Sequence, residues 1–145
     1  MDASILRQVM EEMIPFNKFL GIRADRIERG NVRLELPFRD ELIGDPLKRA
    51  LHGGVLSTLA DVAGGAAAWS AIEDPMARVS TVDLRVDYLR PGRPHTVIAD
   101  ATVVRLGGRI AVTDMKMFHP GGESEPIATG KGVYVVKVPK HASRE

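Results

Sequence analysis

The central helix of this chain is predicted to begin within Leu51-His52-Gly53-Gly54-Val55-Leu56-Ser57-Thr58-Leu59-Ala60-Asp61. A helix N-terminus exposes unpaired N–H donors and about half a positive charge, so it suits a carbonyl oxygen that gains negative charge. The two glycines keep side chains away from that backbone. The carboxylate of Asp61, two turns inside a largely apolar helix, is costly unless something uses or satisfies it. The segment therefore predicts acyl-transfer chemistry.

This helix is expected to run from about residue 53 to residue 72 and to end before Asp74-Pro75. Its middle, residues 60–68, consists almost entirely of small side chains, which allow another backbone to approach closely. We interpret it as the central helix of the domain, with a sheet wrapped tightly around it.

Apolar and polar residues alternate on both sides of the helix, which is the period-two pattern of half-buried strands. A shorter helix is predicted over residues 4–14, closed by Pro15, and residues 39–49 are predicted to form a loop. The predicted strands are residues 22–27, 31–38, 81–89, 96–106, 110–118 and 128–138. This order predicts an α+β domain with one antiparallel sheet of about six strands curled around one helix.

Composition excludes several classes of function. The 145 residues suffice for one domain, expected over residues 1–138, and residues 139–145 are expected to be a disordered tail. The net charge is +1 and no basic block stands out, so no nucleic-acid partner is expected. There is no cysteine, and the histidines show no metal-ligand spacing, so we expect no metal site. The chain lacks an apolar segment typical of a signal peptide or membrane span, which favours a cytoplasmic protein without a membrane partner.

The sequence resembles the hotdog-fold acyl-CoA thioesterases of the phenylacetic-acid-degradation (PaaI-like) type. The resemblance extends from Phe16-Asn17-Lys18-Phe19-Leu20-Gly21-Ile22 to the last strand. Its most specific element is His52-Gly53-Gly54, followed by Asp61 nine residues after the histidine. A second matching block is Ser80-Thr81-Val82-Asp83-Leu84-Arg85-Val86-Asp87-Tyr88-Leu89-Arg90-Pro91. The resemblance implies hydrolysis of an (aryl)acyl-CoA thioester to the free acid and coenzyme A, with no cofactor beyond the coenzyme A of the substrate.

The resemblance also implies roles for four residues. Asp61 is the expected catalytic carboxylate, as general base for water or as nucleophile. The N–H of Gly54 is expected to polarise the thioester carbonyl, His52 to shape the site, and the hydroxyl of Thr81 to assist the water or the carboxylate. Related enzymes often carry Asn or Gln shortly before the histidine, but residues 43–49 contain neither, and Asp45 is the substitute candidate.

The spacing of Gly54 and Asp61 predicts a site shared between two subunits. The two residues lie on one helix face, about 10 Å apart along the axis. One carbonyl cannot contact both, because each contact needs about 3 Å. A second copy must therefore supply its Asp61, and the site should lie across a two-fold dimer interface. The family resemblance favours a tetramer built as a dimer of dimers.

The substrate side is less defined by the sequence. Arginines at hairpin ends could pair with the phosphates of coenzyme A, and Arg109, Arg90 and Arg93 are the candidates. Each of them could equally be a solvated turn residue. Gly53 is expected to line the substrate, and Asn17 is a further candidate, although packing or turn formation in the loop after the first helix is the alternative.

Two other functions remain open on the same fold. A catalytically silent acyl-CoA binding protein would not need the carboxylate of Asp61. An enoyl-thioester hydratase would want an aspartate that precedes a histidine by a short step, whereas here His52 precedes Asp61. A coenzyme A release assay separates these alternatives from the thioesterase.

Overall fold

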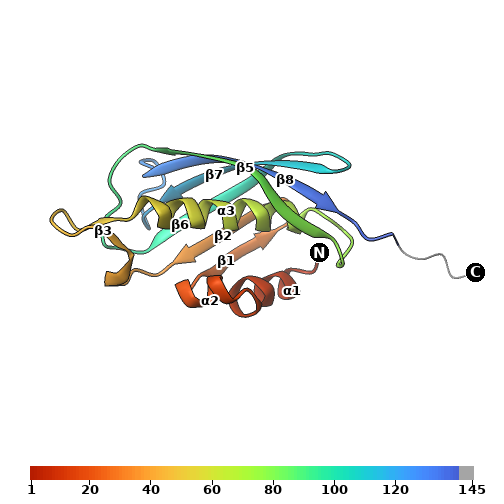
Figure 1. Ribbon diagram of the computed structural model, residues 1–145, viewed down its shortest axis with the longest axis horizontal. Helices are drawn as coiled ribbons and strands as arrows, with labels where there is room; N and C mark the ends of the chain where they lie inside the picture. Colours follow the sequence, from red (N-terminus) through yellow and green to blue (C-terminus); the bar gives the residue numbers. More distant parts are fainter. Residues whose placement is uncertain (141–145) are drawn as a thin grey trace, which may run out of the picture.

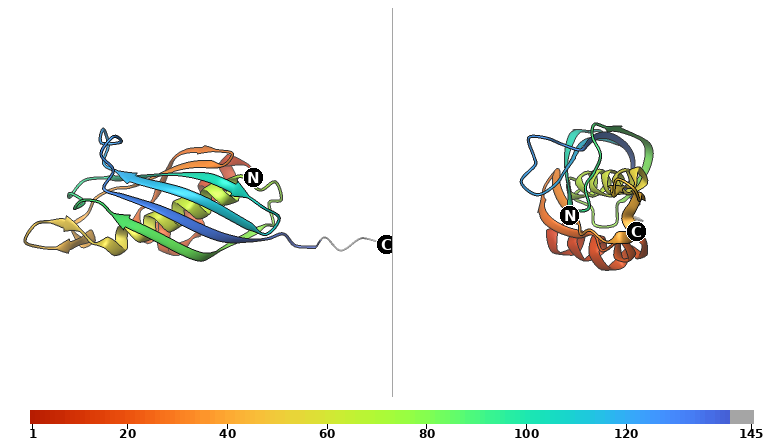
Figure 2. Two further views of the ribbon diagram at one scale, coloured as in Figure 1. Left: turned by 90° about the horizontal axis from the view of Figure 1, so that it is seen from above. Right: turned by 90° about the vertical axis from the view of Figure 1, so that its left-hand side faces the viewer.

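The computed structural model describes residues 1–140, in which a curved sheet wraps around one long helix, α3 (Gly53–Ser70) (Figure 1). Seen along α3, the sheet curls around the helix, and α1 (Ala3–Gln8) and α2 (Pro15–Leu20) lie across the open side (Figure 2). The arrangement confirms the predicted α+β hotdog fold. Of the predicted tail, residues 141–145 lie outside the described residues.

The sheet has six strands, all antiparallel to their neighbours, in the order β1-β2-β6-β7-β8-β5. The strands are β1 (Arg23–Glu28), β2 (Asn31–Leu36), β5 (Arg78–Tyr88), β6 (Val97–Leu106), β7 (Ile110–Phe118) and β8 (Ala128–Lys137). All six were predicted, and the largest shift at a strand start is at β5, which begins three residues earlier than expected. The six predicted strands therefore form one continuous sheet.

Small residues of α3 let the sheet approach the helix. Ala60, Ala63 and Ala67 are fully buried, and Leu59 beside them is buried as well. Across from them, alternate residues of the strands point inward and close the core, and burial of each larger apolar side chain stabilises the fold by about 1.5–3 kcal/mol. The predicted central position of the helix is thereby confirmed.

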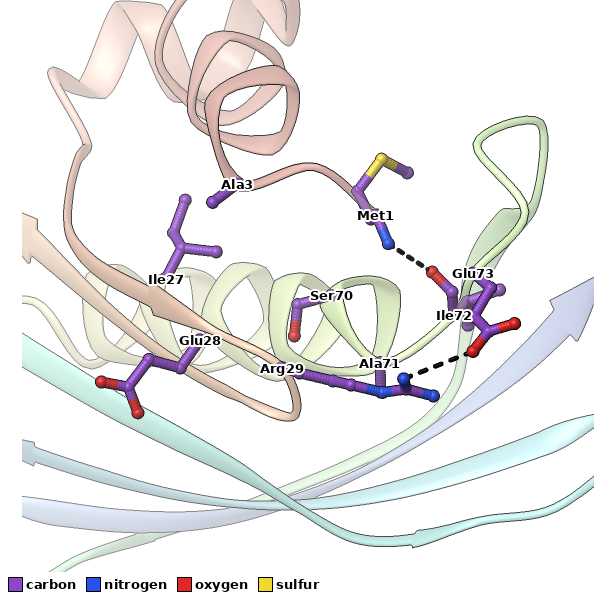
Figure 3. Close-up of a pocket in the computed structure, with 9 residues that line it drawn as sticks. All are labelled: Met1, Ala3, Ile27, Glu28, Arg29, Ser70, Ala71, Ile72 and Glu73. Carbon is purple, nitrogen blue, oxygen red and sulfur yellow. Dashed lines mark hydrogen bonds and ion pairs between the residues drawn. The ribbon is translucent and has the colours of Figure 1, made fainter.

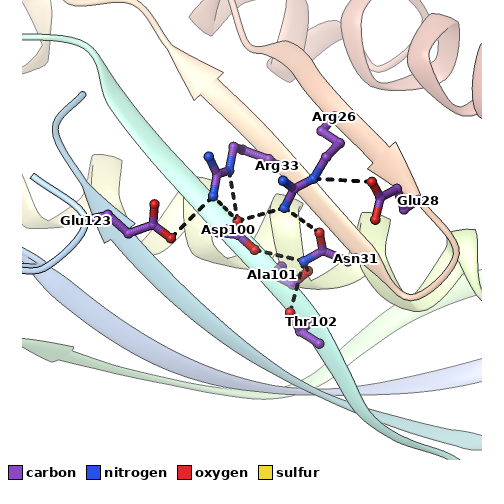
Figure 4. Close-up of polar contacts among 8 residues, drawn as sticks. All are labelled: Arg26, Glu28, Asn31, Arg33, Asp100, Ala101, Thr102 and Glu123. Atoms are coloured by element: carbon purple, nitrogen blue, oxygen red, sulfur yellow. Dashed lines mark hydrogen bonds and ion pairs between the residues drawn. The ribbon is translucent and has the colours of Figure 1, made fainter. Parts of the chain in front are cut away.

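The outer face of the sheet is polar. At its centre the carboxylate of Asp100 accepts hydrogen bonds from Arg33 at 2.6 and 2.8 Å, from Arg26 at 3.2 Å and from Asn31 at 2.8 Å (Figure 4). The hydrogen bond to Asp100 raises the pKa of Arg33 above its usual range. This part of the face is therefore satisfied by its own ion pairs.

The N-terminal region differs from the single predicted helix. After α1 the chain makes a π-helical turn (Val9–Met13) and then begins α2 at Pro15. The first helical region ends before Pro15, as predicted, but proline is also tolerated at the first position of a helix, where its missing N–H would have no partner, so Pro15 starts a second helix. Asn17 consequently lies in a helix and is buried, which corrects its predicted placement in a loop.

The predicted loop over residues 39–49 also contains structure. A 3-10 turn (Asp40–Leu42) leads into a short hairpin of β3 (Ile43–Asp45) and β4 (Ala50–Leu51). The N–H of His52 then donates to the carbonyl of Leu42 at 2.9 Å. The 3-10 turn thus anchors His52, the residue just before α3.

The two edges of the sheet are unlike. On β1, the N–H of Ala24 donates to the carboxylate of Glu11 at 2.9 Å, and Arg7 donates to the carbonyl of Ala24. On β5, the outer backbone edge meets no partner within residues 1–140. The bulge next to Thr81 leaves Val82 61% exposed on this strand. The sheet therefore has one side-chain-capped edge and one open edge.

Candidate active site

Asp61 lies on α3 and faces the neighbouring strands β5 and β8. The hydroxyl of Thr81 donates to Oδ1 of Asp61 at 2.8 Å, which is the contact that the family resemblance predicts. The hydroxyl of Tyr134 lies 3.0 Å from the main-chain carbonyl oxygen of Asp61 and 3.3 Å from the same Oδ1. Within residues 1–140, Oδ2 makes no hydrogen bond or ion pair. Asp61 is therefore a half-buried carboxylate held through one oxygen.

Tyr134 reaches Asp61 because glycine stands at two positions around it. On α3, a Cβ at Gly64 would overlap the Tyr134 hydroxyl, and on β8 a Cβ at Gly132 would lie 2.5 Å from its ring. Burial, and then the charge of Asp61, raise the pKa of Tyr134 above its usual range, so the hydroxyl stays protonated. The sequence analysis missed this residue. The available signal was glycine inside a helix and a strand, which often marks close approach of another group.

At the N-terminus of α3, called its entrance below, the hydrogen bonding of Gly54 differs from expectation. Its N–H donates to Nδ1 of His52 at 2.9 Å, so His52 caps the helix and the predicted carbonyl-polarising amide is already engaged. The N–H of Gly53, the first residue of the helix, has no partner in the described part of the chain. Tyr88 flanks it, since its hydroxyl donates to the carbonyl of Gly53 at 3.0 Å and contacts Ser57. The free N–H donor therefore belongs to Gly53 and not to Gly54, one residue earlier than predicted.

Gly53 and Asp61 of one chain are too far apart for one carbonyl group. They are eight residues apart on a continuous helix, which corresponds to about 12 Å along its axis. A reacting carbonyl needs a donor at about 3 Å from its oxygen and the attacking group at a similar distance from its carbon. The two halves of the expected chemistry therefore remain separate in a single chain.

An apolar pocket of about 290 Å³ adjoins Asp61 and Thr81. Its apolar walls come from the N-terminal helices, α3 and β5 and include Met10, Ile14, Phe16, Trp69 and Val79. The predicted site residue Asn17 also lines it, 1% exposed, with its Nδ2 3.8 Å from the sulfur of Met10. The pocket gives Asp61 an apolar chamber on its own chain.

The predicted arginines fall into two places. Arg90 and Arg93 line a pocket of about 390 Å³ beside the loop whose Gly92 carbonyl accepts from the N–H of Leu51 at 3.0 Å. Arg90 lies 3.7 Å from Glu125, whereas Arg93 makes no ion pair within residues 1–140. This pocket is therefore close to the entrance of α3.

His119 fixes that loop. Its Nε2 accepts from the N–H of Arg93 at 2.9 Å, and its Nδ1 lies 2.8 Å from the carbonyl oxygen of Thr96. With Nε2 as the acceptor, Nδ1 is the nitrogen that donates to the carbonyl oxygen of Thr96. The main chain at Arg93 is thus held in place.

Arg109 lies in the β6–β7 turn, at the opposite end of β6 from Arg90 and Arg93. A further cavity, of about 220 Å³, lies near the C-terminal end of α3, where Arg29 pairs with Glu73 at 3.3 Å (Figure 3). Neither feature reaches Asp61 within one chain. Within residues 1–140 no three His, Asp or Glu side chains gather as a metal site would require, and no helix is long and apolar enough to cross a bilayer.

The chain is similar to several known proteins. The family model described as the thioesterase superfamily matches residues 49–125. A Halobacterium salinarum protein that bears an esterase name is 38% identical over 141 residues, 93% of each chain. The Escherichia coli protein named medium/long-chain acyl-CoA thioesterase YigI is 30% identical over 135 residues, 85% of this chain and 86% of that protein.

Solved structures give the same picture. A thioesterase family protein from Silicibacter pomeroyi superimposes with a TM-score of 0.83 at 29% identity, covering 94% of this chain and 98% of that one. A Shewanella oneidensis protein related to the thioesterase superfamily gives 0.81 at 32% identity, covering 92% and 94%. The solved structures and the family model therefore indicate the same protein family.

Proposed function

This chain belongs to the thioesterase superfamily and is a thioester hydrolase, and we propose that it hydrolyses apolar acyl-CoA thioesters at a site completed by two subunits. The observation that carries the proposal is Asp61, held by Thr81 at the mouth of an apolar pocket. A pure acyl-CoA binding protein has no need of a carboxylate there.

In the proposed reaction Asp61 of one subunit attacks the carbonyl carbon, either directly or through a water molecule. The N–H of Gly53 of the other subunit donates to the carbonyl oxygen. As general base, the carboxylate takes a proton from water as the water oxygen attacks; as nucleophile, it attacks first and water then hydrolyses the mixed anhydride. In both routes the carbon–sulfur bond breaks, the thiolate of coenzyme A leaves and regains a proton, and the free acid remains. The helix N-terminus stabilises the oxyanion between these steps.

The open edge of β5 supports a shared site. Thr81 of β5 contacts Asp61, and Tyr88 further along the strand contacts Gly53. If β5 pairs antiparallel with its own copy around a two-fold axis midway between Thr81 and Tyr88, Asp61 of one subunit faces the α3 entrance of the other. The pairing would also cover Val82, the exposed apolar residue of the bulge. A tetramer formed from two such dimers remains our expectation.

A shared site predicts that two inactive variants restore each other. Asp61→Asn removes the carboxylate and Gly53→Pro removes the amide, so each homodimer is expected to be inactive. In a heterodimer one site receives Asp61 and Gly53 both intact, so random mixing should return about a quarter of wild-type activity. Co-expression with two different tags and a coenzyme A release assay measure this. Activity that stays at the level of the separate variants would place the whole site in one chain.

The acyl group is proposed to enter the pocket beside Asp61. Its walls combine aliphatic Met10 and Val79 with aromatic Phe16 and Trp69, so they suit an aryl group or a medium-length chain. The PaaI-like resemblance suggests an arylacyl group, whereas the relative YigI is named for medium- and long-chain substrates. We favour medium-chain acyl groups, because this relative covers most of the chain.

A hydrolysis screen tests the function. Wild-type protein and Asp61→Asn are incubated with acetyl-, phenylacetyl-, octanoyl- and dodecanoyl-CoA, and release of free thiol is followed. Octanoyl-CoA is expected to give roughly 100-fold or higher kcat/KM than acetyl-CoA, since each buried methylene contributes about 0.8 kcal/mol. Crotonyl-CoA is included to detect hydration without thiol release. Absence of thiol release from every thioester would refute the proposal.

The coenzyme A end of the substrate is proposed to meet Arg90 and Arg93. The paired change Arg90→Gln and Arg93→Gln is expected to raise KM about tenfold and leave kcat unchanged, because phosphate contacts contribute uniform binding. Arg105→Gln, an exposed arginine on β6, is the matched control for the loss of charge. An unchanged KM, or a truncated pantetheine thioester affected to the same extent, would contradict this assignment.

A further inference from the structure

Asp61 meets the rest of the protein through one of its two carboxylate oxygens. Oδ1 accepts from Thr81 at 2.8 Å and lies 3.3 Å from the hydroxyl of Tyr134. In the described part of the chain Oδ2 makes no hydrogen bond or ion pair. Two hydroxyls from two different strands, β5 and β8, thus converge on the same oxygen.

We propose that Tyr134 is a positioning residue: its buried hydroxyl, acting with that of Thr81, fixes Asp61 through Oδ1 and leaves Oδ2 as the oxygen that acts on water or on the thioester. The inference rests on the proposed function, because it takes Asp61 as the catalytic carboxylate. Tyr134 acts through Asp61 and takes no part in bond making.

The fold makes room for this hydroxyl from two sides. On α3, a Cβ at Gly64 would overlap the Tyr134 hydroxyl and lie 2.7 Å from Oγ1 of Thr113. On β8, a Cβ at Gly132 would lie 2.6 Å from the same hydroxyl. A buried tyrosine hydroxyl needs a hydrogen-bond partner, and here the oxygens that accept from it belong to Asp61. The two glycines therefore form a slot that brings the hydroxyl to Asp61.

The hydroxyl also holds the backbone of the residue that it positions. It lies 3.0 Å from the carbonyl oxygen of Asp61 and 3.3 Å from Oδ1, so its one proton is shared between the main chain and the carboxylate. Tyr134 is 1% exposed, and burial followed by the charge of Asp61 keeps its pKa above the usual range. Asp61 and Tyr134 are the titratable groups among the residues that line the pocket. Tyr134 is thus a permanent donor at neutral pH.

Tyr134→Phe tests the proposal, because it removes the hydroxyl and keeps the ring. In the full-length protein with the best acyl-CoA substrate, kcat is expected to fall about tenfold while KM stays within about twofold. The acid side of the kcat–pH profile is expected to move to higher pH, since the carboxylate loses a donor that favours its charged form. An unchanged kcat and an unchanged profile would overturn the proposal.

Ser70→Ala is the matched control. Ser70 is another buried hydroxyl and is the last residue of α3, where it donates to the carbonyl of Ala67 at 2.7 Å. Its loss is expected to lower the Tm and leave kcat and the pH profile as in the wild type. If both variants changed kcat and the profile equally, Tyr134 would have only the structural effect of a buried hydroxyl, and the proposal would be wrong.

A second readout avoids the question of folding. The sequence has two tyrosines, so in a Tyr88→Phe background biosynthetic incorporation of 3-fluorotyrosine labels position 134 alone. Fluorine makes the hydroxyl a stronger donor at nearly constant size. Relative to the unlabelled Tyr88→Phe protein, the acid side of the profile is expected to move to lower pH, opposite to the effect of Tyr134→Phe. A profile that does not move contradicts the proposal.

The outcomes separate this inference from the function on which it rests. If the wild type releases no thiol from any thioester, the proposed function fails. If the wild type is active and Asp61→Asn is not, while Tyr134→Phe keeps the wild-type kcat and pH profile, the function stands and the positioning role of Tyr134 is refuted.

Discussion

Asp61→Asn is expected to lower kcat by about 1,000-fold or more and to leave KM within a fewfold. The amide oxygen of asparagine can still accept from Thr81 and Tyr134, so the local hydrogen bonds survive. The substitution removes the negative charge that either takes a proton from water or attacks the thioester. Steady-state rates of thiol release and calorimetric binding of a non-hydrolysable thioether analogue measure the two effects separately.

The control for this variant is Asp114→Asn. Asp114 lies on the outer face of the sheet, 2.8 Å from Lys131, and carries the same chemical change away from the pocket. It is expected to keep the wild-type kcat. A near-normal rate for Asp61→Asn, in protein whose Tm matches the wild type, would remove Asp61 from the mechanism.

Gly53→Pro is expected to lower kcat by about 100- to 1,000-fold, the usual effect of deleting one oxyanion donor. Proline is favourable at the first helix position, and His52 before it has φ −64° and ψ 130°, the extended conformation that a residue preceding proline adopts. The helix should therefore form normally while the one free amide of its entrance is absent. Thiol release and far-ultraviolet circular dichroism measure the two properties.

Gly53→Ala is the matched variant, because it keeps the N–H. In Gly53→Ala the new Cβ would lie 3.3 Å from the ring of Tyr88. In Gly53→Pro the Cβ is attached to the same Cα, so both variants crowd this ring. Alanine is expected to stay within a fewfold of the wild-type kcat. Equal losses in both variants would mean that crowding, and not the amide, controls the rate, and the donor would have to be sought elsewhere.

The fold was predictable because each element carries its own signal. The small residues of α3 indicate close approach of a sheet, and they are the residues that the sheet covers. Strict alternation in β2 gave its observed start, whereas β5 carries a bulge and begins three residues before the predicted strand. The break at Pro15 was misread because proline ends one helix and begins another equally well, and the sequence alone does not distinguish the two.

The site was predictable in composition and less so in geometry. Asp61 and Thr81 meet as expected, since both belong to motifs that the resemblance carries. The engaged amide of Gly54 follows from the side-chain conformation of His52, which no spacing rule specifies. Tyr134 is 73 residues away from Asp61 in the sequence and reads as an ordinary inward-facing strand residue. Such long-range contacts depend on the order of strands in the sheet.

The unlike edges of the sheet have a consequence for assembly. A sheet with two open edges can add copies at both sides and grow into a filament. Here Glu11 and Arg7 occupy the backbone of Ala24 on β1, whereas the outer edge of β5 has no partner within residues 1–140. If β5 pairs with its own copy as proposed, growth through paired edges would stop at two copies. Two side chains of the N-terminal helical region would then protect the protein against open-ended polymerisation.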